Sequence, residues 1–162
     1  MNDTARARGT LPGVGEETQE IDNLLTLDHE VVHTYGHYLR RFVADIRARD
    51  ATPIVCSLVP RKVWHDGRIA RNERSYAQWA RETAAAEHVG FIDLNEIIAR
   101  RYEDLGPEEV EAFFADKDTH TTAEGARINA TAVVAGLKAL QDCGLCGFLS
   151  PAGDAIPAAP RD

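Results

Sequence analysis

The sequence has no long apolar run, no surplus of basic residues and no leader-like segment, and each absence argues against a class of protein. No segment approaches the roughly 18 consecutive apolar residues that a membrane-spanning helix needs. The formal net charge is −8 over 162 residues, which argues against nucleic acid as a partner because phosphate binding depends on basic surface. The first ten residues are polar and have no apolar core, so no signal peptide is predicted. The composition predicts a globular domain with neither membrane nor nucleic acid as a partner.

Cysteine is also scarce, and the three cysteines are too few for a disulfide framework. Cys56 lies in an apolar run, so we predict a buried small hydrophobic residue. Cys143 and Cys146 have CxxC spacing, but no second pair or neighbouring His completes four zinc ligands. The pair also follows the last predicted helix, outside any βαβ unit. We therefore predict ordinary thiols and no metal site.

Helical and strand patterns alternate along the chain. This order predicts an α/β fold with a parallel sheet. Residues 1–149 form one domain in this interpretation, with a loop region over 1–24 and the α/β portion over 25–149, and the Pro/Ala-rich residues 150–162 are predicted to be disordered. The predicted helices cover residues 27–49, 73–88, 95–104, 107–115 and 122–141, the strands cover Thr52–Pro60 and Phe91–Leu94, and loops cover 4–24 and 61–72.

Two predicted strands are few for the helices that must pack on them. A two-stranded parallel sheet leaves its edges unpaired and apolar faces bare. The strand count therefore predicts that the chain is the C-terminal part of a larger domain, and that alone it self-associates through an incomplete core.

The most informative stretch is the run 118–126, Asp-Thr-His-Thr-Thr-Ala-Glu-Gly-Ala, which places acids and a histidine in one turn before the last predicted helix. A carboxylate beside His120 would fix its tautomer and offset its charge, as a general base requires. Thr122 suits the N-cap, and Glu124 places an acid in the first turn. The alternative, a capped helix with a solvated histidine beside it, is the one that spacing alone favours.

This loop resembles the last motif of the SGNH (GDSL-type) hydrolases, and in particular their rhamnogalacturonan acetylesterase branch. Further segments are similar to family segments in the same order: Arg8–Gly13, Gly15–Thr18, Thr52–Arg61 and Phe91–Asn95. The resemblance implies a flavodoxin-like three-layer α/β/α fold. It also implies removal of acetyl groups from an acidic pectic polysaccharide, such as rhamnogalacturonan, through an acyl-serine and without metal or cofactor. Full-length relatives would be secreted or periplasmic.

The family's nucleophile motif, Gly-Asp-Ser, is absent from the sequence. The opening Met1-Asn2-Asp3 resembles the end of the family's Gly-x-Asn-Asp motif. By resemblance Asn2 is then the oxyanion-hole donor, and the chain corresponds to the C-terminal part of an esterase. Such a fragment is predicted to be inactive alone, because its general base has no serine to activate.

The resemblance makes His120 the general base, but its carboxylate partner departs from the family pattern. The family spacing is Asp-x-x-His, and Lys117 stands three residues before His120. A shift of one residue in the loop would bring Asp118, which we prefer, or Asp116 into place. Otherwise the pair is not formed.

A basic segment, 61–74, follows the first predicted strand, where open α/β sheets place their ligand crevice. Arginine binds carboxylates in forked geometry, and a tryptophan offers a flat face to a sugar ring. We therefore predict Arg61 and Trp64 as substrate-binding residues; the alternative is a solvated basic loop. A different class of function, a non-catalytic remnant or a carbohydrate-binding module, also fits the sequence.

Overall fold

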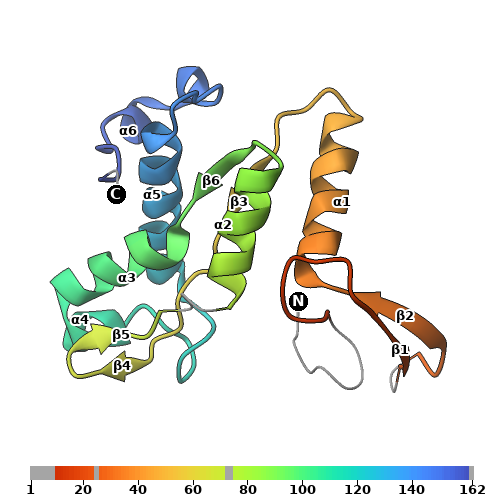
Figure 1. Cartoon of the computed structure of the whole chain (residues 1–162). Coiled ribbons are helices and arrows are strands. Elements are labelled where there is room, and N and C mark those ends of the chain that lie inside the picture. Colours follow the sequence, from red (N-terminus) through yellow and green to blue (C-terminus); the bar gives the residue numbers. More distant parts are fainter. Residues whose placement is uncertain (1–9, 24–25, 72–74, 161–162) are drawn as a thin grey trace.

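The two predicted parallel strands pair with each other in the computed structural model, which describes residues 10–23, 26–71 and 75–160 (Figure 1). Strand β3 (Ile54–Cys56) runs parallel to β6 (Gly90–Ile92), with Val55 opposite Phe91. Helices α2 (Tyr76–Ala86) and α5 (Ala123–Ala139) lie on either side of this pair (Figure 1). The predicted α/β fold is confirmed. No described helix is both long enough and apolar enough to cross a bilayer.

Alternation along the strands sends side chains into two separate cores. Val55 packs with Val43 of α1 (Tyr35–Arg47) and with α2. Ile54 and Ile92 face the opposite way, toward α5 and α3 (Leu94–Leu105). Because a buried parallel strand is apolar on both faces, the short runs at β3 and β6 suffice to hold helices on both sides.

The helices begin where the sequence offers capping side chains. Thr34 accepts from the backbone N–H of His37 at 3.1 Å, Asp93 from Glu96 at 3.2 Å and Thr122 from Gly125 at 3.3 Å. These caps satisfy backbone N–H groups that have no partner within the first helical turn. Between α3 and α4 (Pro107–Glu111), Gly106 has a φ of 85° and separates the two helices, as the predicted ranges 95–104 and 107–115 require.

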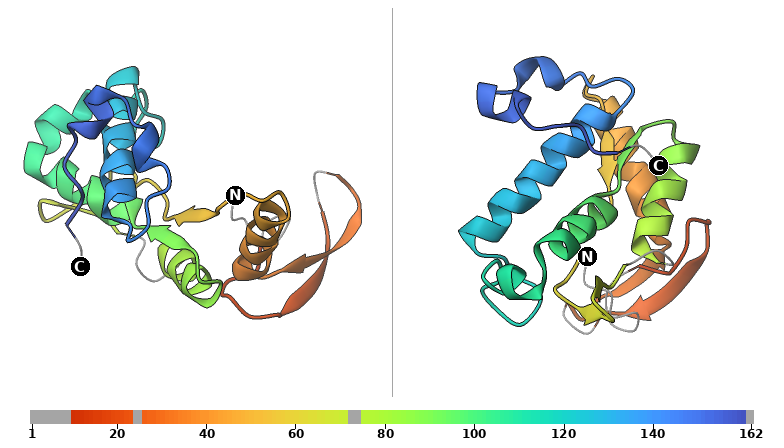
Figure 2. Two further views of the ribbon diagram at one scale, coloured as in Figure 1. Left: turned by 90° about the horizontal axis from the view of Figure 1, so that it is seen from above. Right: turned by 90° about the vertical axis from the view of Figure 1, so that its left-hand side faces the viewer.

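Two hairpins replace regions that we predicted to be loop or helix. Strands β1 (Thr18–Asp22) and β2 (His29–His33) pair antiparallel. The predicted helix over 27–49 therefore starts at Tyr35, because two adjacent valines in β2 mimic helical spacing and Thr34 caps the true start. The hairpin and α1 lie to one side of the sheet (Figure 2).

The second hairpin, β4 (Trp64–His65) with β5 (Arg68–Ile69), lies inside the predicted loop 61–72. Asp66 and Gly67 have φ values of 49° and 78°. A two-residue turn with positive φ at both positions matches the twist of a hairpin, and Asp-Gly is among its preferred sequences. That dipeptide is the overlooked signal.

The C-terminal segment differs from the predicted disorder over residues 150–160. Ser150 caps a short helix, α6 (Pro151–Asp154), by accepting from the N–H of Gly153. Further on, the N–H of Ala159 donates to the carbonyl of Ala135 on α5 at 2.9 Å. Proline at the first helical position and the contacts with α5 order this Pro/Ala-rich segment. Residues 161–162 lie outside the described part.

Two cysteine predictions are wrong. Cys143 and Cys146 form a disulfide with a Cα–Cα distance of 5.4 Å. A turn before the short 3₁₀ helix η1 (Cys146–Phe148) brings the pair together, since the N–H of Cys146 donates to the carbonyl of Cys143 at 3.0 Å. Cys56 is exposed rather than buried, because its end of β3 is left uncovered in the described part of the chain.

Candidate active-site loop

The loop that carries His120 joins α4 to α5 and is closed at its base. Phe114 and Thr121 form an isolated antiparallel bridge. The N–H of Ala115 donates to the carbonyl of His120 at 2.7 Å, and the N–H of Thr122 to the carbonyl of Phe113 at 2.9 Å. These bonds tie the two ends of the loop together, so the histidine is held by backbone contacts on both sides.

Asp116 organises the interior of this loop. Its Oδ1 accepts the backbone N–H groups of Asp118 at 3.1 Å, Thr119 at 2.8 Å and His120 at 3.0 Å. Its Oδ2 lies 2.5 Å from Nδ1 of His120. One carboxylate therefore shapes the turn and also orients the imidazole.

Asp118, our preferred partner, does not contact the ring. Its carboxylate accepts from the hydroxyl of Thr119 at 2.6 Å instead. Our preference assumed an extended segment, in which residues two apart point the same way. The chain turns back between Lys117 and Thr119, so the carboxylate four residues before His120 reaches the ring. Because of this tight turn, an aspartate four residues before the histidine makes the contact that an aspartate three residues before it makes in the Asp-x-x-His pattern.

The surroundings of Asp116 keep it ionised. The backbone N–H groups of Thr119 and His120, followed by the His120 side chain, hold the pKa of the Asp116 carboxyl well below its usual range. A carboxylate that accepts several hydrogen bonds is stabilised in its charged form. Neutral His120 would then carry its proton on Nδ1, toward Asp116, leaving Nε2 as a free acceptor. The His120 side chain is 81% exposed.

Lys62 and Gly125 attach the loop to the body of the protein. The N–H of Lys62 donates to the carbonyl of Asp118 at 3.0 Å. The ammonium of Lys62, with a side chain only 7% exposed, lies 2.7 Å from Glu111 of α4. A Cβ on Gly125 would lie 2.2 Å from the carbonyl oxygen of Phe113, so only glycine permits this approach of α5. Sequence reasoning did not identify Lys62, since a lysine in a basic segment gives no sign of burial.

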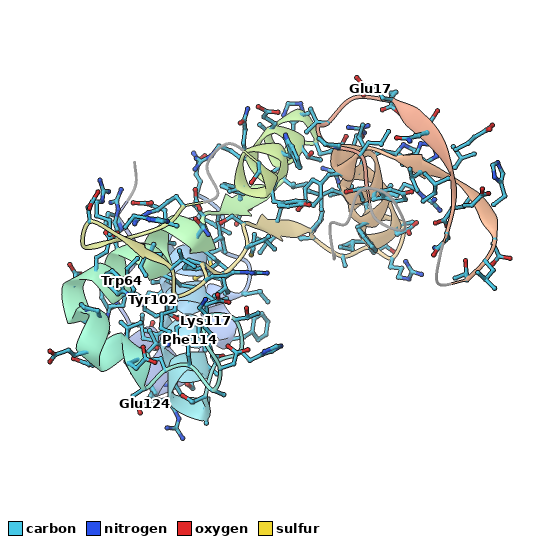
Figure 3. All side chains as sticks on the ribbon, turned by 90° about the horizontal axis from the view of Figure 1, so that it is seen from below. Glu17, Trp64, Tyr102, Phe114, Lys117 and Glu124 are labelled. Carbon is cyan, nitrogen blue, oxygen red and sulfur yellow. A yellow bond between two sulfur atoms is a disulfide. The ribbon has the colours of Figure 1, made fainter. Side chains whose placement is uncertain are left out.

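The predicted substrate-binding residues differ in exposure. Arg61 is exposed and makes no ion pair with the described residues. Trp64 is half-buried and packs against the core that contains Tyr102 and Phe114, and Figure 3 shows these three side chains in one lobe with Lys117. Arg71 is buried, and it binds Glu96 at 2.8 Å and also Glu103. Asn2 and Arg74 lie outside the described residues.

Ser57 and Ser150 do not offer a free nucleophile. Ser57 is 4% exposed. Its hydroxyl donates to Asp93 at 2.7 Å and accepts the N–H of Asn95 at 2.9 Å. Ser150 caps α6. Both hydroxyls are engaged in local structure.

His120 does not line the two grooves that lie beside α2, α3 and α5. A groove of about 810 Å³ lies between α3, α5 and residues 156–160, and a smaller one lies beside α2; neither includes a residue of the loop 115–122. The loop thus presents its imidazole on an open surface. Among the described residues, the arrangement provides an oriented and exposed imidazole.

Two curated proteins similar to this chain carry the same name, rhamnogalacturonan acetylesterase. No family model matches the chain. A protein of Bacillus subtilis named probable rhamnogalacturonan acetylesterase YesY is 31% identical over 112 residues, which cover 66% of this chain and 52% of that protein. The rhamnogalacturonan acetylesterase of Emericella nidulans is 28% identical over 131 residues, which cover 81% and 52%.

A solved structure, that of the Bacillus subtilis protein YxiM, has a similar fold. The TM-score is 0.58 with 24% identity, over 63% of this chain and 30% of that one. The chain spans about half, 52%, of the length of the curated relatives it matches.

Proposed function

Since the chain is related to the SGNH-type rhamnogalacturonan acetylesterases, we propose that it supplies the histidine and aspartate of an acetylesterase active site. The substrate is an acetylated, acidic pectic polysaccharide. The observation that carries the proposal is the contact between Nδ1 of His120 and Oδ2 of Asp116, at 2.5 Å. It leaves Nε2 of the imidazole available for a serine hydroxyl.

In this reaction Nε2 of His120 takes the proton of a serine as its oxygen attacks the acetyl carbonyl carbon. Collapse of the tetrahedral intermediate breaks the ester bond, and His120 returns the proton to the departing sugar hydroxyl. Water, deprotonated by His120, then attacks the carbonyl carbon of the acyl-serine; the bond to the serine oxygen breaks, acetate leaves, and His120 returns the proton to the serine oxygen. Asp116 stays ionised throughout, which its low pKa supports. It stabilises the imidazolium without taking its proton.

The serine comes from a polypeptide segment outside these 162 residues, which contain no Gly-Asp-Ser. Asn2 remains a proposed donor to the oxyanion. Removing one such donor typically raises the barrier by about 2.7–4 kcal/mol.

Arg61 is the residue we propose for binding the acidic substrate. Lys62, its neighbour, is bonded to the carbonyl of Asp118, so the backbone of Arg61 is fixed beside the His120 loop. An exposed guanidinium there suits a uronate carboxylate, which arginine binds in forked geometry. Trp64 remains a weaker candidate for stacking on a sugar, because much of its ring packs on the core.

A non-catalytic carbohydrate-binding role is the alternative, and the open surface around His120 is the observation that favours it. A binding module needs Arg61 and the surface but not the imidazole. Substitution of His120 therefore separates the two functions.

A chimera tests the proposal. The part of the Bacillus subtilis protein YesY that lies outside the matched region is joined to this chain. The acetate released from acetylated rhamnogalacturonan is then measured. We expect activity from the chimera and none from this chain alone. His120→Ala should lower kcat by about a thousandfold or more, and Asp116→Asn by about a hundredfold or more. Asp118→Asn is the matched control and should retain activity.

Two results would contradict the proposal. One is full activity in the His120→Ala chimera. The other is an inactive, well-folded chimera that still binds the polysaccharide, which would favour the binding module.

A further inference from the structure

The disulfide between Cys143 and Cys146 carries a further inference. It closes a turn, residues 143–146, that follows the end of α5. We propose that this disulfide turn is a redox-sensitive switch. In the oxidised form it holds the C-terminal segment, residues 150–160, against α5, and reduction by a dithiol releases that segment. The inference is independent of the proposed ester chemistry.

The C-terminal segment returns alongside α5 (Figure 1). The ammonium of Lys138, in the last turn of α5, donates to the carbonyl of Asp154 at 2.6 Å. One turn earlier in α5, the carbonyl of Ala135 accepts the N–H of Ala159 at 2.9 Å. These contacts run in opposite directions along the two segments, so the chain reverses close to the disulfide turn. The conformation of that turn therefore determines whether the C-terminal segment meets α5.

Side-chain packing contributes little to the disulfide turn. The large apolar side chains in it and just after it, Leu145 and Phe148, are 52% and 86% exposed. A Cβ built on Gly144 or Gly147 would meet no atom within 4 Å. A backbone hydrogen bond of 3.0 Å spans the same residues as the disulfide, but one such bond adds only modest net stability. We therefore expect the order of the turn to depend on the covalent bond.

The disulfide lies where a reductant can reach it. Both cysteines are partly exposed, and exposed disulfides are reduced more readily than buried structural ones. Only Gly144 and Leu145 separate the two cysteines. A disulfide that closes so short a loop restricts the unfolded chain less than one that closes a long loop. Access and loop length both favour a disulfide that can change its oxidation state.

Reduction is a two-step exchange that consumes one dithiol. A thiolate of the dithiol attacks one sulfur of the pair, which breaks the Sγ–Sγ bond and forms a mixed disulfide. The second thiolate of the dithiol attacks the dithiol's own sulfur in that mixed disulfide, closes a new S–S bond within the reductant and releases the cysteine sulfur. Overall the dithiol gives two electrons and two protons to Cys143 and Cys146, which become thiols.

Release of the C-terminal segment changes the groove of about 810 Å³ between α3 and α5. Residues 156–160 form one wall of this groove, and Ile97 and Ile128 line it from the two helices. Both isoleucines are partly buried and pack on the larger core. Without the wall they face solvent, so the reduced protein exposes apolar surface that the oxidised protein covers. The oxidation state thus controls access to the groove.

Amide hydrogen exchange, measured by mass spectrometry, tests the switch. The full chain is compared as purified in air and after treatment with dithiothreitol, and the intact mass confirms the gain of two hydrogens. We expect reduction to accelerate exchange of the Ala159 amide, which is bonded to α5, by about tenfold or more. The amide of Ser57, which donates to Ile92 in the sheet, should exchange at the same rate in both forms.

Variants separate the disulfide from other effects of the reductant. The double variant Cys143→Ser with Cys146→Ser should show the fast exchange at Ala159 without dithiothreitol and should not respond to it. Cys56→Ser is the matched control, because it replaces the free cysteine, and it should keep the full response. Circular dichroism checks folding. If the double variant does not fold, the unaltered chain in its two oxidation states decides.

Three outcomes would overturn the proposal. The first is equal exchange at Ala159 in the oxidised and reduced forms. The second is an acceleration at Ser57 as large as that at Ala159, which would make the disulfide a stabiliser of the whole chain. The third is a chain purified in air whose Cys143 and Cys146 are both thiols.

Discussion

At the residue scale, Asp116 has two roles that the structure joins in one carboxylate. Three backbone N–H groups bind one oxygen and the imidazole binds the other. The turn and the ring orientation therefore depend on the same side chain. Losing Asp116 should disturb the loop as well as the histidine.

Asp116→Ala should accelerate amide hydrogen exchange at Asp118, Thr119 and His120 by about tenfold or more, because these N–H groups lose their acceptor. Exchange followed by NMR measures this. Asp118→Ala removes a carboxylate from the same loop without removing the acceptor, so it should leave the three rates nearly unchanged. Equal effects of the two variants would contradict the assignment.

The loop also shows how far sequence reasoning reaches at this scale. The run from Asp118 to Ala126 predicts a histidine with an acid beside it. It also predicts Thr122 as the N-cap of the last helix, and this cap is confirmed. The choice between Asp116 and Asp118 depended on how the backbone turns. Hydrogen bonds between one side chain and three successive N–H groups determine that turn, and spacing alone does not reveal them.

At the element scale, Arg71 joins the end of β5 to α3. Its side chain is 8% exposed, and it contacts Glu96, Glu103 and the carbonyl of Ile69. The basic segment is therefore partly structural. We predicted Arg61 as a substrate-binding residue, and only the structure separates this exposed arginine from Arg71 of the same segment, whose side chain is buried.

Arg71→Met should lower the free energy of unfolding by about 3 kcal/mol, because it leaves two half-buried carboxylates without their partner. Arg68→Met is the matched control, since Arg68 is 75% exposed and lies 3.8 Å from Glu103. Urea denaturation measures both. A loss in Arg68→Met as large as that in Arg71→Met would contradict the role of the buried ion pair.

The same cluster gives a pH dependence. Hydrogen bonds from Arg71 lower the pKa of both Glu96 and Glu103. A lowered folded-state pKa contributes stability above the ordinary glutamate pKa of about 4.3 and loses it as pH falls through the folded-state value. The stability difference between the unaltered protein and Arg71→Met should therefore shrink below about pH 4.

Helices were predicted more accurately than hairpins for a physical reason. Helix starts are fixed by local caps such as Thr34 and Asp93. Strand β2 has no such local signal, because its partner β1 lies in a stretch without periodicity. The hairpin of β4 and β5 differs, because the sequence Asp66-Gly67 is itself a local signal for its turn.

At the scale of the whole molecule, the described chain has two helix-covered cores around two parallel strands, and β3 has an uncovered edge. The resemblance to rhamnogalacturonan acetylesterases, first seen in scattered motifs, is confirmed by two relatives with that name. The match covers 52% of the length of each relative. The sequence predicted the fold class because buried strand runs and capped helices are local. The exposure of Cys56 was not predictable, since it depends on what lies beside β3.

We predict that the isolated chain is oligomeric, aggregated or molten at neutral pH, because Phe42, Leu58 and Val59 expose apolar surface. Light scattering with thermal unfolding measures this. Phe42→Ser should reduce association, and Arg41→Ser should not. A monodisperse monomer with a sharp cooperative transition would show that the chain covers its own core.

The central claim is that His120 is held as a general base with Nε2 free. Nitrogen-15 NMR of the imidazole, in this chain, tests it without any partner or substrate. We expect neutral His120 to carry its proton on Nδ1. The proton resonance of this Nδ1–H should lie downfield, disappear in Asp116→Asn and persist in Asp118→Asn. A neutral ring protonated on Nε2, unchanged by Asp116→Asn, would contradict the account.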